Sequence, residues 1–322
     1  MSQAILAGFS ALIMTVLLPA CLLEPVQPEA EQVLLVIEQG RDRPKQAKLR
    51  LHTGVAVEEM ELETYLVGVV LSEMPASFEP EALKAQAVAA RTFALRQMEG
   101  GKHADFDLCT DSSCCQAWRS AQSMEQKLGS SFQKYWQKAQ DAVAETKGLV
   151  LTYNGALIDA VYFSCSGGTT EDAVAVWGSD VPYLQSVSSA GEEAASSYSS
   201  TVSIGLAQFR GIVLAENAQA DLSGSAETWF GAVQTTRGGG VAAMEIGGVS
   251  FSGTRLRTLF GLKSTKFSVV VTAEAVVFQV SGYGHRVGMS QYGANAMAKA
   301  GSTFDQILHH YYSGVTLEEM GK

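Results

Sequence analysis

The chain has 322 residues, of which 47% are hydrophobic and 17% charged, and its formal net charge is −10. This composition excludes an intrinsically disordered chain and predicts about two domains of ~150 residues each. The acidic balance argues against nucleic acid as the main partner, because binding phosphates needs clustered Lys and Arg. Five cysteines are an odd number, which excludes a fully paired set of disulfides.

Residues 1–21 predict an export segment, because the first 20 residues carry no charge and residues 5–18 are almost continuously apolar. The run Leu18-Pro19-Ala20-Cys21 resembles a bacterial lipoprotein cleavage box, in which the Cys21 thiol takes the lipid. A secretory signal cut near Ala20 and an uncleaved anchor are the alternatives. Residues 22–32 contain Glu and Pro and are interpreted as a tether. We therefore expect an exported, periplasmic or cell-envelope protein whose cysteines can oxidise.

The hydrophobic patterns further along the chain predict an α+β fold. In chain order we expect strands at 33–38 and 47–53, helices at 63–72, 77–98 and 132–143, a hairpin of 149–153 with 156–163 around Asn154-Gly155, a surface loop at 186–203, short β runs within 241–280, and helices at 291–300 and 304–311. We assign 33–185 and 275–322 to a helical, mixed-sheet core, and 186–274 to a smaller β-rich lobe.

Glu73 is the first candidate for chemistry. It is the only carboxylate between Glu63 and Glu79, and it ends an apolar helix against Met74-Pro75. A carboxyl group among apolar side chains loses hydration, which raises its pKa and suits it to act as a general acid. A solvated glutamate at a helix end is the alternative interpretation.

The helix that follows carries Lys84, Val88, Arg91 and Leu95 on one face. Arg91 therefore lies on a largely apolar stripe, where a half-buried guanidinium needs an anionic or strongly polar partner. A direct pair with Glu73 would lower the carboxyl pKa and oppose an acid role. We therefore expect Arg91 to hold a substrate or a backbone carbonyl, and Lys84 to support the site.

Several motifs together resemble the stage II sporulation protein D (SpoIID/LytB) family. They are Tyr65-Leu66-x-Gly68-Val69-Val70-x-x-Glu73-Met74-Pro75, the run from Glu81 to Thr92, Trp177-Gly178, Pro182-Tyr183-Leu184, Leu256-Arg257 with Gly261-Leu262-Lys263-Ser264-Thr265-x-Phe267, and Gly284-His285-x-Val287-Gly288-Met289-Ser290-Gln291-Tyr292-Gly293-Ala294. The resemblance covers roughly residues 50–317. Arg286 replaces the usual glycine after the histidine, which would crowd that loop or force a different backbone angle.

The resemblance implies a peptidoglycan lytic transglycosylase that cuts glycan strands, preferentially those without stem peptides, in a cleft between two lobes. By this likeness Glu73 is the catalytic acid and Arg91 an essential site residue. The residues that would contact the glycan are His285, Ser290, Gln291, Tyr292 and Thr169. Some relatives resemble enhancers of an N-acetylmuramoyl-L-alanine amidase, so a non-catalytic wall-binding module with an amidase partner is the alternative.

One carboxylate suffices for the implied reaction. Hydrolytic glycosidases use two, one as acid and one as base or nucleophile. In a transglycosylase the C6 hydroxyl of muramic acid attacks C1 and leaves a 1,6-anhydro end, so no second carboxylate has to activate water. Glu73 would protonate the leaving oxygen and then accept the proton of the C6 hydroxyl.

A cluster of candidate metal ligands lies within residues 103–116. His103, Cys109 and Cys115 are evenly spaced six residues apart, and three soft N and S ligands suit Zn²⁺. Some family members resemble this pattern around zinc, which would organise the loop beside the cleft. Cys114 is open as a further ligand, a free thiol, or half of a disulfide with Cys109 or Cys165.

Cys165 gives a rival enzyme class. As a nucleophile with His285 as its base, it would make the chain a cysteine amidase or peptidase of the cell wall. A small packing residue at a strand end is the simpler interpretation, and we favour it. No organic cofactor is expected.

Overall fold

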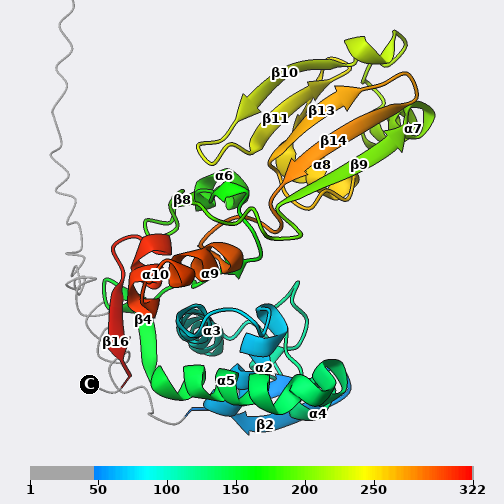
Figure 1. Cartoon of the computed structure of the whole chain (residues 1–322). Coiled ribbons are helices and arrows are strands. Elements are labelled where there is room, and N and C mark those ends of the chain that lie inside the picture. The colour runs from blue at the N-terminus through cyan, green and yellow to red at the C-terminus, as the bar shows by residue number, and fades with distance from the viewer. Residues whose placement is uncertain (1–46, 321–322) are drawn as a thin grey trace, which may run out of the picture. The chain divides into compact units, whose positions relative to one another are not determined.

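The computed structural model describes residues 47–320, and they form an α+β fold, as predicted (Figure 1). These residues belong to one compact unit, Gly40–Lys322. The expected strand at 33–38, the tether and Cys21 lie outside the described residues. Among the residues that are described, no helix is both long and apolar enough to cross a bilayer.

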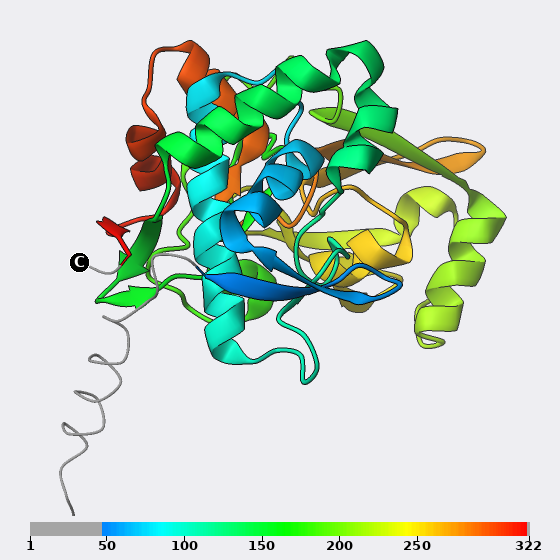
Figure 2. The ribbon, with the colours of Figure 1, turned by 90° about the horizontal axis from the view of Figure 1, so that it is seen from below.

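The first of two hydrophobic cores is built around a long helix, α3 (Pro80–Gly100). Its alanine-rich face lets other helices approach closely, and α3 contacts α2 (Leu62–Glu73), α5 (Phe132–Glu145), α9 (Gln291–Lys299) and α10 (Phe304–Tyr311). Figure 2 shows α2, α3 and α5 side by side. The remaining elements of this region are β1 (Lys48–His52), β2 (Val57–Glu61), β3 (Leu108–Cys109), α4 (Ala121–Leu128), β4 (Leu149–Tyr153), β5 (Ala156–Leu157), β6 (Tyr162–Phe163), β7 (Gly168–Thr169), α6 (Ala173–Trp177), β8 (Ser188–Ser189), β15 (Met289–Ser290) and β16 (Thr316–Glu319).

Residues 204–280 enclose the second core, where Phe209 stacks between Trp229 and Phe260. Two three-stranded sheets, β10-β11-β12 and β13-β14-β9, surround it with two helices. Their bounds are β9 (Ser199–Gly205), α7 (Leu206–Glu216), β10 (Phe230–Thr235), β11 (Val241–Ile246), β12 (Val249–Ser252), α8 (Gly253–Leu259), β13 (Phe267–Val271) and β14 (Ala275–Ser281). We assigned β14 to the other region from sequence, but it is the middle strand of this second-core sheet, between β13 and β9.

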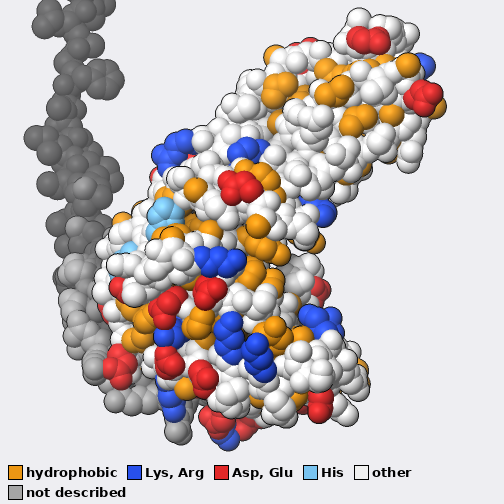
Figure 3. Space-filling view, viewed as in Figure 1, with side chains coloured by type: hydrophobic (Ala, Val, Ile, Leu, Met, Phe, Trp, Pro, Cys, Tyr) orange, Lys and Arg blue, Asp and Glu red, His pale blue; other side chains and the backbone are white. Residues whose placement is uncertain are grey.

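Charged side chains are distributed unevenly on the face seen in Figure 3. Acidic and basic groups are interspersed over the first core, whereas apolar and uncharged side chains dominate over β10, β11 and β13. No broad basic surface is visible on this face.

The predicted hairpin turn is confirmed, but the strand expected at 156–163 is wrong in part, since it breaks into β5 and β6 and β6 pairs with β15. The Asn154-Gly155 turn has φ of 51° and 78°, as a two-residue hairpin loop of this type requires, and it joins β4 to β5. The loop expected at 186–203 is wrong in part. It contains β8 and the start of β9, and it buries Glu192 completely, because hydroxyl and backbone donors surround that carboxylate.

Candidate active site

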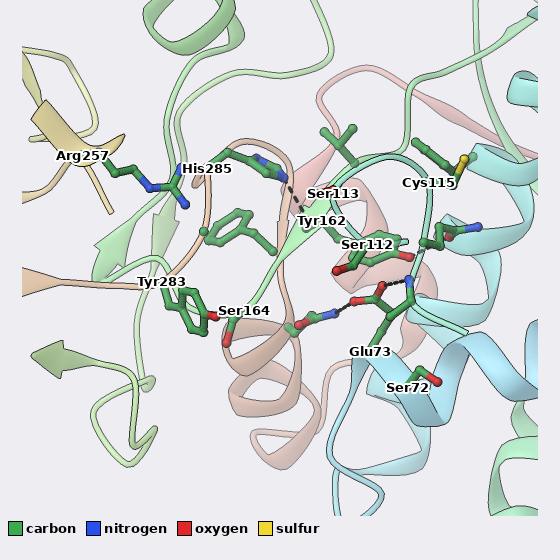
Figure 4. Close-up of a pocket in the computed structure, with 17 residues that line it drawn as sticks. Ser72, Glu73, Ser112, Ser113, Cys115, Tyr162, Ser164, Arg257, Tyr283 and His285 are labelled. Atoms are coloured by element: carbon green, nitrogen blue, oxygen red, sulfur yellow. Dashed lines mark hydrogen bonds between the residues drawn. The ribbon is translucent and has the colours of Figure 1, made fainter. Parts of the chain in front are cut away.

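A pocket of about 710 Å³ is lined by residues from the end of α2, the segment before α4, the β6 region, α8 and the start of α9 (Figure 4). Its described lining is Ser72, Glu73, Phe93, Ser112, Ser113, Cys115, Gln116, Ala117, Val161, Tyr162, Phe163, Ser164, Arg257, Tyr283, Gly284, His285 and Gln291. Glu73 is the only carboxylate in this set. We call this cavity the Glu73 pocket.

Glu73 is the last residue of α2, which ends because Met74 turns to an extended conformation before Pro75. Its Oε1 accepts a hydrogen bond from the Ala117 N–H at 2.7 Å, and its Oε2 accepts a longer one from Gln291 Nε2 at 3.5 Å. Burial raises the pKa of the carboxyl group, and these two bonds only partly oppose the rise. The negative end of the α2 dipole also disfavours the carboxylate. Glu73 therefore has the properties of a proton donor.

A close approach of backbones places Ala117 beside Glu73. Gly68, on the preceding turn of α2, lies against Trp118 and the carbonyl of Arg119, and any side chain there would collide with both. Because Gly68 has no side chain, the segment 117–119 can lie directly on the helix. The sequence motif containing Gly68 thus positions the donor that holds the Glu73 carboxyl.

A polar network that the sequence did not predict includes three residues of the pocket lining, Gln116, Tyr162 and Gln291. The Tyr162 hydroxyl donates to Gln116 Oε1 at 2.6 Å, and Gln116 Nε2 donates to the Tyr65 hydroxyl at 3.1 Å. Gln291 Nε2 also lies 3.4 Å from Gln86 Oε1. Nothing in the spacing of these residues signals the network, because its members come from five separate segments.

His285 lines the pocket, but both of its ring nitrogens are engaged by the backbone. Nε2 donates to the Tyr162 carbonyl at 3.1 Å, and Nδ1 accepts from the Val287 N–H at 3.1 Å. Burial lowers the pKa of the imidazole to about 4, so the ring is neutral near pH 7. It packs against Phe163 and Trp177. His285 therefore forms a fixed apolar wall and has no free nitrogen to act as a base.

Arg91 does not line the Glu73 pocket. Its guanidinium is fully buried and makes a two-pronged ion pair with Glu63, at 2.9 and 2.6 Å. It also donates to the carbonyls of Val143 and Leu149, each at 3.2 Å. The expected backbone carbonyls are present, but Glu63 takes the place we expected a substrate to fill. Arg91 thus joins α2, α3, α5 and β4 within the first core.

Four other predicted site residues also lie outside the pocket lining. Lys84 pairs with Glu81 and Glu145 at 2.7 and 2.6 Å. The remaining three serve local structure: Ser290 caps α9, Tyr292 packs edge-on against Phe78, and the Thr169 carbonyl accepts from Arg286. Of the expected glycan contacts, the structure brings only His285 and Gln291 together with Glu73.

Cys165 is not placed to attack a substrate. It is fully buried, its Sγ lies 3.1 Å from Glu192 Oε2, and burial raises the pKa of the thiol to about 12. Glu192 Oε2 also accepts from the Ser166 N–H and hydroxyl and from the Gly167 N–H. With His285 bonded elsewhere, the geometry provides no Cys–His pair.

The three predicted metal ligands come together, and Cys114, whose role the sequence left open, lies with them. The ligand atoms of His103, Cys109, Cys114 and Cys115 all lie within 4.8 Å of one another, and all the described cysteines are free thiols. His103 Nε2 lies 3.4 and 3.7 Å from the sulfurs of Cys115 and Cys114, which are 4.0 Å apart. Tetrahedral zinc with N and S ligands requires separations of about 3.5–3.8 Å. The donor set of one nitrogen and three sulfurs therefore suits zinc chemically, and Cys114 is placed to serve as a further ligand.

The expectation that Arg286 forces a different backbone angle is wrong, because Arg286 keeps the angle that a glycine would adopt. Its φ is +67°, in the left-handed region that glycine favours. The side chain is fully buried, pairs with Glu171 at 3.0 Å, and donates to the carbonyls of Ser166, Thr169 and Gly238. Because Gly238 belongs to the β10–β11 loop, Arg286 ties that loop to the chain beside His285.

Comparison with known proteins identifies the family. Residues 51–153 match the SpoIID family model, described as "Stage II sporulation protein". The chain is 40% identical to Stage II sporulation protein D of Bacillus subtilis over 82% of its length and 76% of the relative, and 38% identical to that of Bacillus amyloliquefaciens over the same shares. It is 32% identical to the Amidase enhancer of Bacillus subtilis, over 78% of this chain and 40% of that protein. The chain therefore belongs to the SpoIID family.

Proposed function

We propose that this protein acts on the cell wall as a lytic transglycosylase, cleaving peptidoglycan glycan strands with Glu73 as general acid and base. One observation carries the proposal: the described lining of a 710 Å³ pocket holds a single carboxyl group, and burial raises its pKa. A hydrolytic glycosidase would need a second carboxylate. The names of the relatives support a role at the cell envelope.

The reaction needs one proton donor that becomes an acceptor. Protonated Glu73 gives its proton to the glycosidic oxygen as the bond from that oxygen to C1 of muramic acid breaks. The C6 hydroxyl of the same sugar bonds to C1 and releases its proton to Glu73, which restores the acid. The Ala117 N–H, 2.7 Å from Oε1, stabilises the carboxylate between these two transfers.

The test is to incubate the purified protein with stem-peptide-free glycan and analyse the products by mass spectrometry. We expect 1,6-anhydromuramic ends from the wild type and none from Glu73→Gln. The matched control is Glu58→Gln, which changes an exposed carboxyl group on β2 and should leave turnover unchanged. Reducing ends alone would identify a hydrolase, and turnover by Glu73→Gln would remove Glu73 from the mechanism.

A second candidate function is enhancement of a cell-wall amidase, favoured by the similarity to a protein named Amidase enhancer. The two roles are separable, because enhancement by binding does not need a proton donor. If Glu73→Gln stimulates an N-acetylmuramoyl-L-alanine amidase as strongly as the wild type does, the protein is an enhancer irrespective of its own cleavage. Loss of stimulation in this variant would tie the effect to cleavage.

We also propose that zinc is held by His103, Cys109, Cys114 and Cys115 and organises the loop that ends at Ala117. Bound zinc would supply a structural cross-link there. Elemental analysis of the purified protein should give one zinc per chain, Cys109→Ser should lose it, and Cys165→Ser should keep it. A disulfide among these cysteines, with no zinc, would contradict the proposal. Lipidation of Cys21 stays a prediction, tested by lipid labelling of Cys21→Ala against the wild type.

A further inference from the structure

Arg257 is the one cation in the described lining of the Glu73 pocket. It projects from α8 toward His285, and Figure 4 shows it at the opposite end of the pocket from Glu73. Its guanidinium has one hydrogen-bond partner among the described residues, the Leu262 carbonyl, which accepts from Nε at 3.4 Å. The two terminal nitrogens have no carboxylate partner within the described part of the chain.

Several other arginines of the described chain do have a carboxylate partner. Arg91 and Arg286, which are buried, pair with Glu63 and Glu171. Arg255, two residues before Arg257 on the same helix, pairs with Glu216. Half-buried and open to the pocket, Arg257 therefore stands apart from arginines that have a structural partner.

The surroundings of Arg257 do not neutralise its charge. His285 is neutral, and the positive charge of Arg257 contributes to the low pKa of that imidazole, after the larger effect of burial. Burial lowers the pKa of the Arg257 guanidinium itself, the sign of a cation that has lost water without gaining a full counter-ion. A planar guanidinium whose two terminal nitrogens are free matches a carboxylate in a two-pronged arrangement.

We propose that Arg257 binds the free lactyl carboxylate of a muramic acid residue and so selects glycan from which the stem peptide is absent. The inference rests on the proposed function, because it takes the glycan as the ligand of this pocket. When a stem peptide is attached, the same carbon belongs to a neutral amide, which offers no charge to the guanidinium. A pocket of about 710 Å³ that contains both Glu73 and Arg257 is in the size range of small-ligand sites.

The experiment measures binding, not cleavage, in a Glu73→Gln background. The probes are two peptide-free glycan fragments of equal length, one with free lactyl carboxylates and one in which these are converted to neutral carboxamides. With Arg257 present, we expect the acid to bind about 10- to 100-fold more tightly than the amide, as charge-assisted hydrogen bonds predict. Adding Arg257→Gln should bring the two affinities within about threefold.

Two further variants separate charge, shape and general effects of substitution. Arg257→Lys keeps the charge but loses the planar fork, and it should give intermediate discrimination. Arg255→Gln, the matched control on the same helix, should discriminate as the parent does. If the protein that retains Arg257 binds the acid and the amide equally, the inference is overturned. This comparison needs no second substitution, so the inference can be tested even if Arg257→Gln fails to fold. Discrimination that survives in a folded Arg257→Gln protein would overturn it too.

Failure of the Arg257 inference can be distinguished from failure of the proposed transglycosylase function. If the acid is preferred but the wild type produces no anhydro ends, the pocket binds stripped glycan without cleaving it. If the wild type cleaves but binds acid and amide equally, the transglycosylase proposal stands and the role of Arg257 is wrong.

Discussion

Removing the Arg91 guanidinium is expected to destabilise the protein rather than merely reduce its activity. In Arg91→Ala the Glu63 carboxylate, only 26% exposed, loses both of its charge-assisted bonds, and two backbone carbonyls lose a donor. Breaking a buried ion pair from one side costs about 3–5 kcal/mol. Urea unfolding, followed by circular dichroism, should show a loss of this size in the free energy of unfolding.

Arg96→Ala is the matched control, because Arg96 lies on the same helix and also pairs with a carboxylate. Its partner is Asp159 at 2.8 Å, but the two side chains are 39% and 41% exposed. An exposed pair of this kind contributes under about 1 kcal/mol. The interpretation is refuted if Arg91→Ala unfolds at the wild-type urea concentration and yet has lost turnover, since Arg91 would then act on the substrate and not on the fold.

The protonation state of Glu73 is expected to control the pH dependence of turnover. Because burial raises the pKa of Glu73, kcat should fall as the pH rises through that pKa. An increase in kcat over this pH range would contradict the acid role. The folded state also holds this proton more tightly than the unfolded state does. The free energy of unfolding should therefore decrease as the pH rises from the ordinary carboxyl pKa to the raised one. Urea titrations of Glu73→Gln should not show this decrease. Cys165→Ser keeps a hydrogen-bond donor to Glu192, so its turnover, measured as the rate of product release from glycan, should be within about twofold of the wild-type value. Loss of turnover in a folded variant would restore the thiol hypothesis. Arg286→Ala leaves Glu171 buried without its cation and should lower the free energy of unfolding by about 3–5 kcal/mol in the same urea assay, and a change below about 1 kcal/mol would show that the pair contributes little.

Sequence reasoning located Glu73 because its signal is local. A lone carboxylate at the end of an apolar helix, two residues before a proline, can be recognised within a dozen residues. The candidate metal ligands are also local, because they lie within a span of 13 residues. In both cases the neighbours that determine the chemistry are close in the chain.

The partners of Arg91 and the burial of Glu192 were missed because they depend on packing between distant segments. Glu63 and Arg91 lie on two helices, 28 residues apart, and only the way these helices pack decides that the two side chains meet. Glu192 lies in a Ser- and Ala-rich stretch that has the composition of a surface loop. Its burial is stabilised by donors from three segments, including Ser290, 98 residues away, which no local pattern reveals.

The Gln291–Glu73 contact has a consequence for how the protein folds. It joins positions 218 residues apart, and contacts between such distant positions form slowly. The family model ends at residue 153, so a fragment of that extent would contain Glu73 and the cysteine cluster but lack Arg257, His285 and Gln291. In such a fragment, or in a nascent chain of that length, the Glu73 carboxyl would lack the part of the pocket lining that follows residue 153, so burial would raise its pKa less. The full rise in the Glu73 pKa, on which the proposed acid role depends, therefore requires the last part of the chain to dock, and this rise can serve as a titrimetric marker of complete folding.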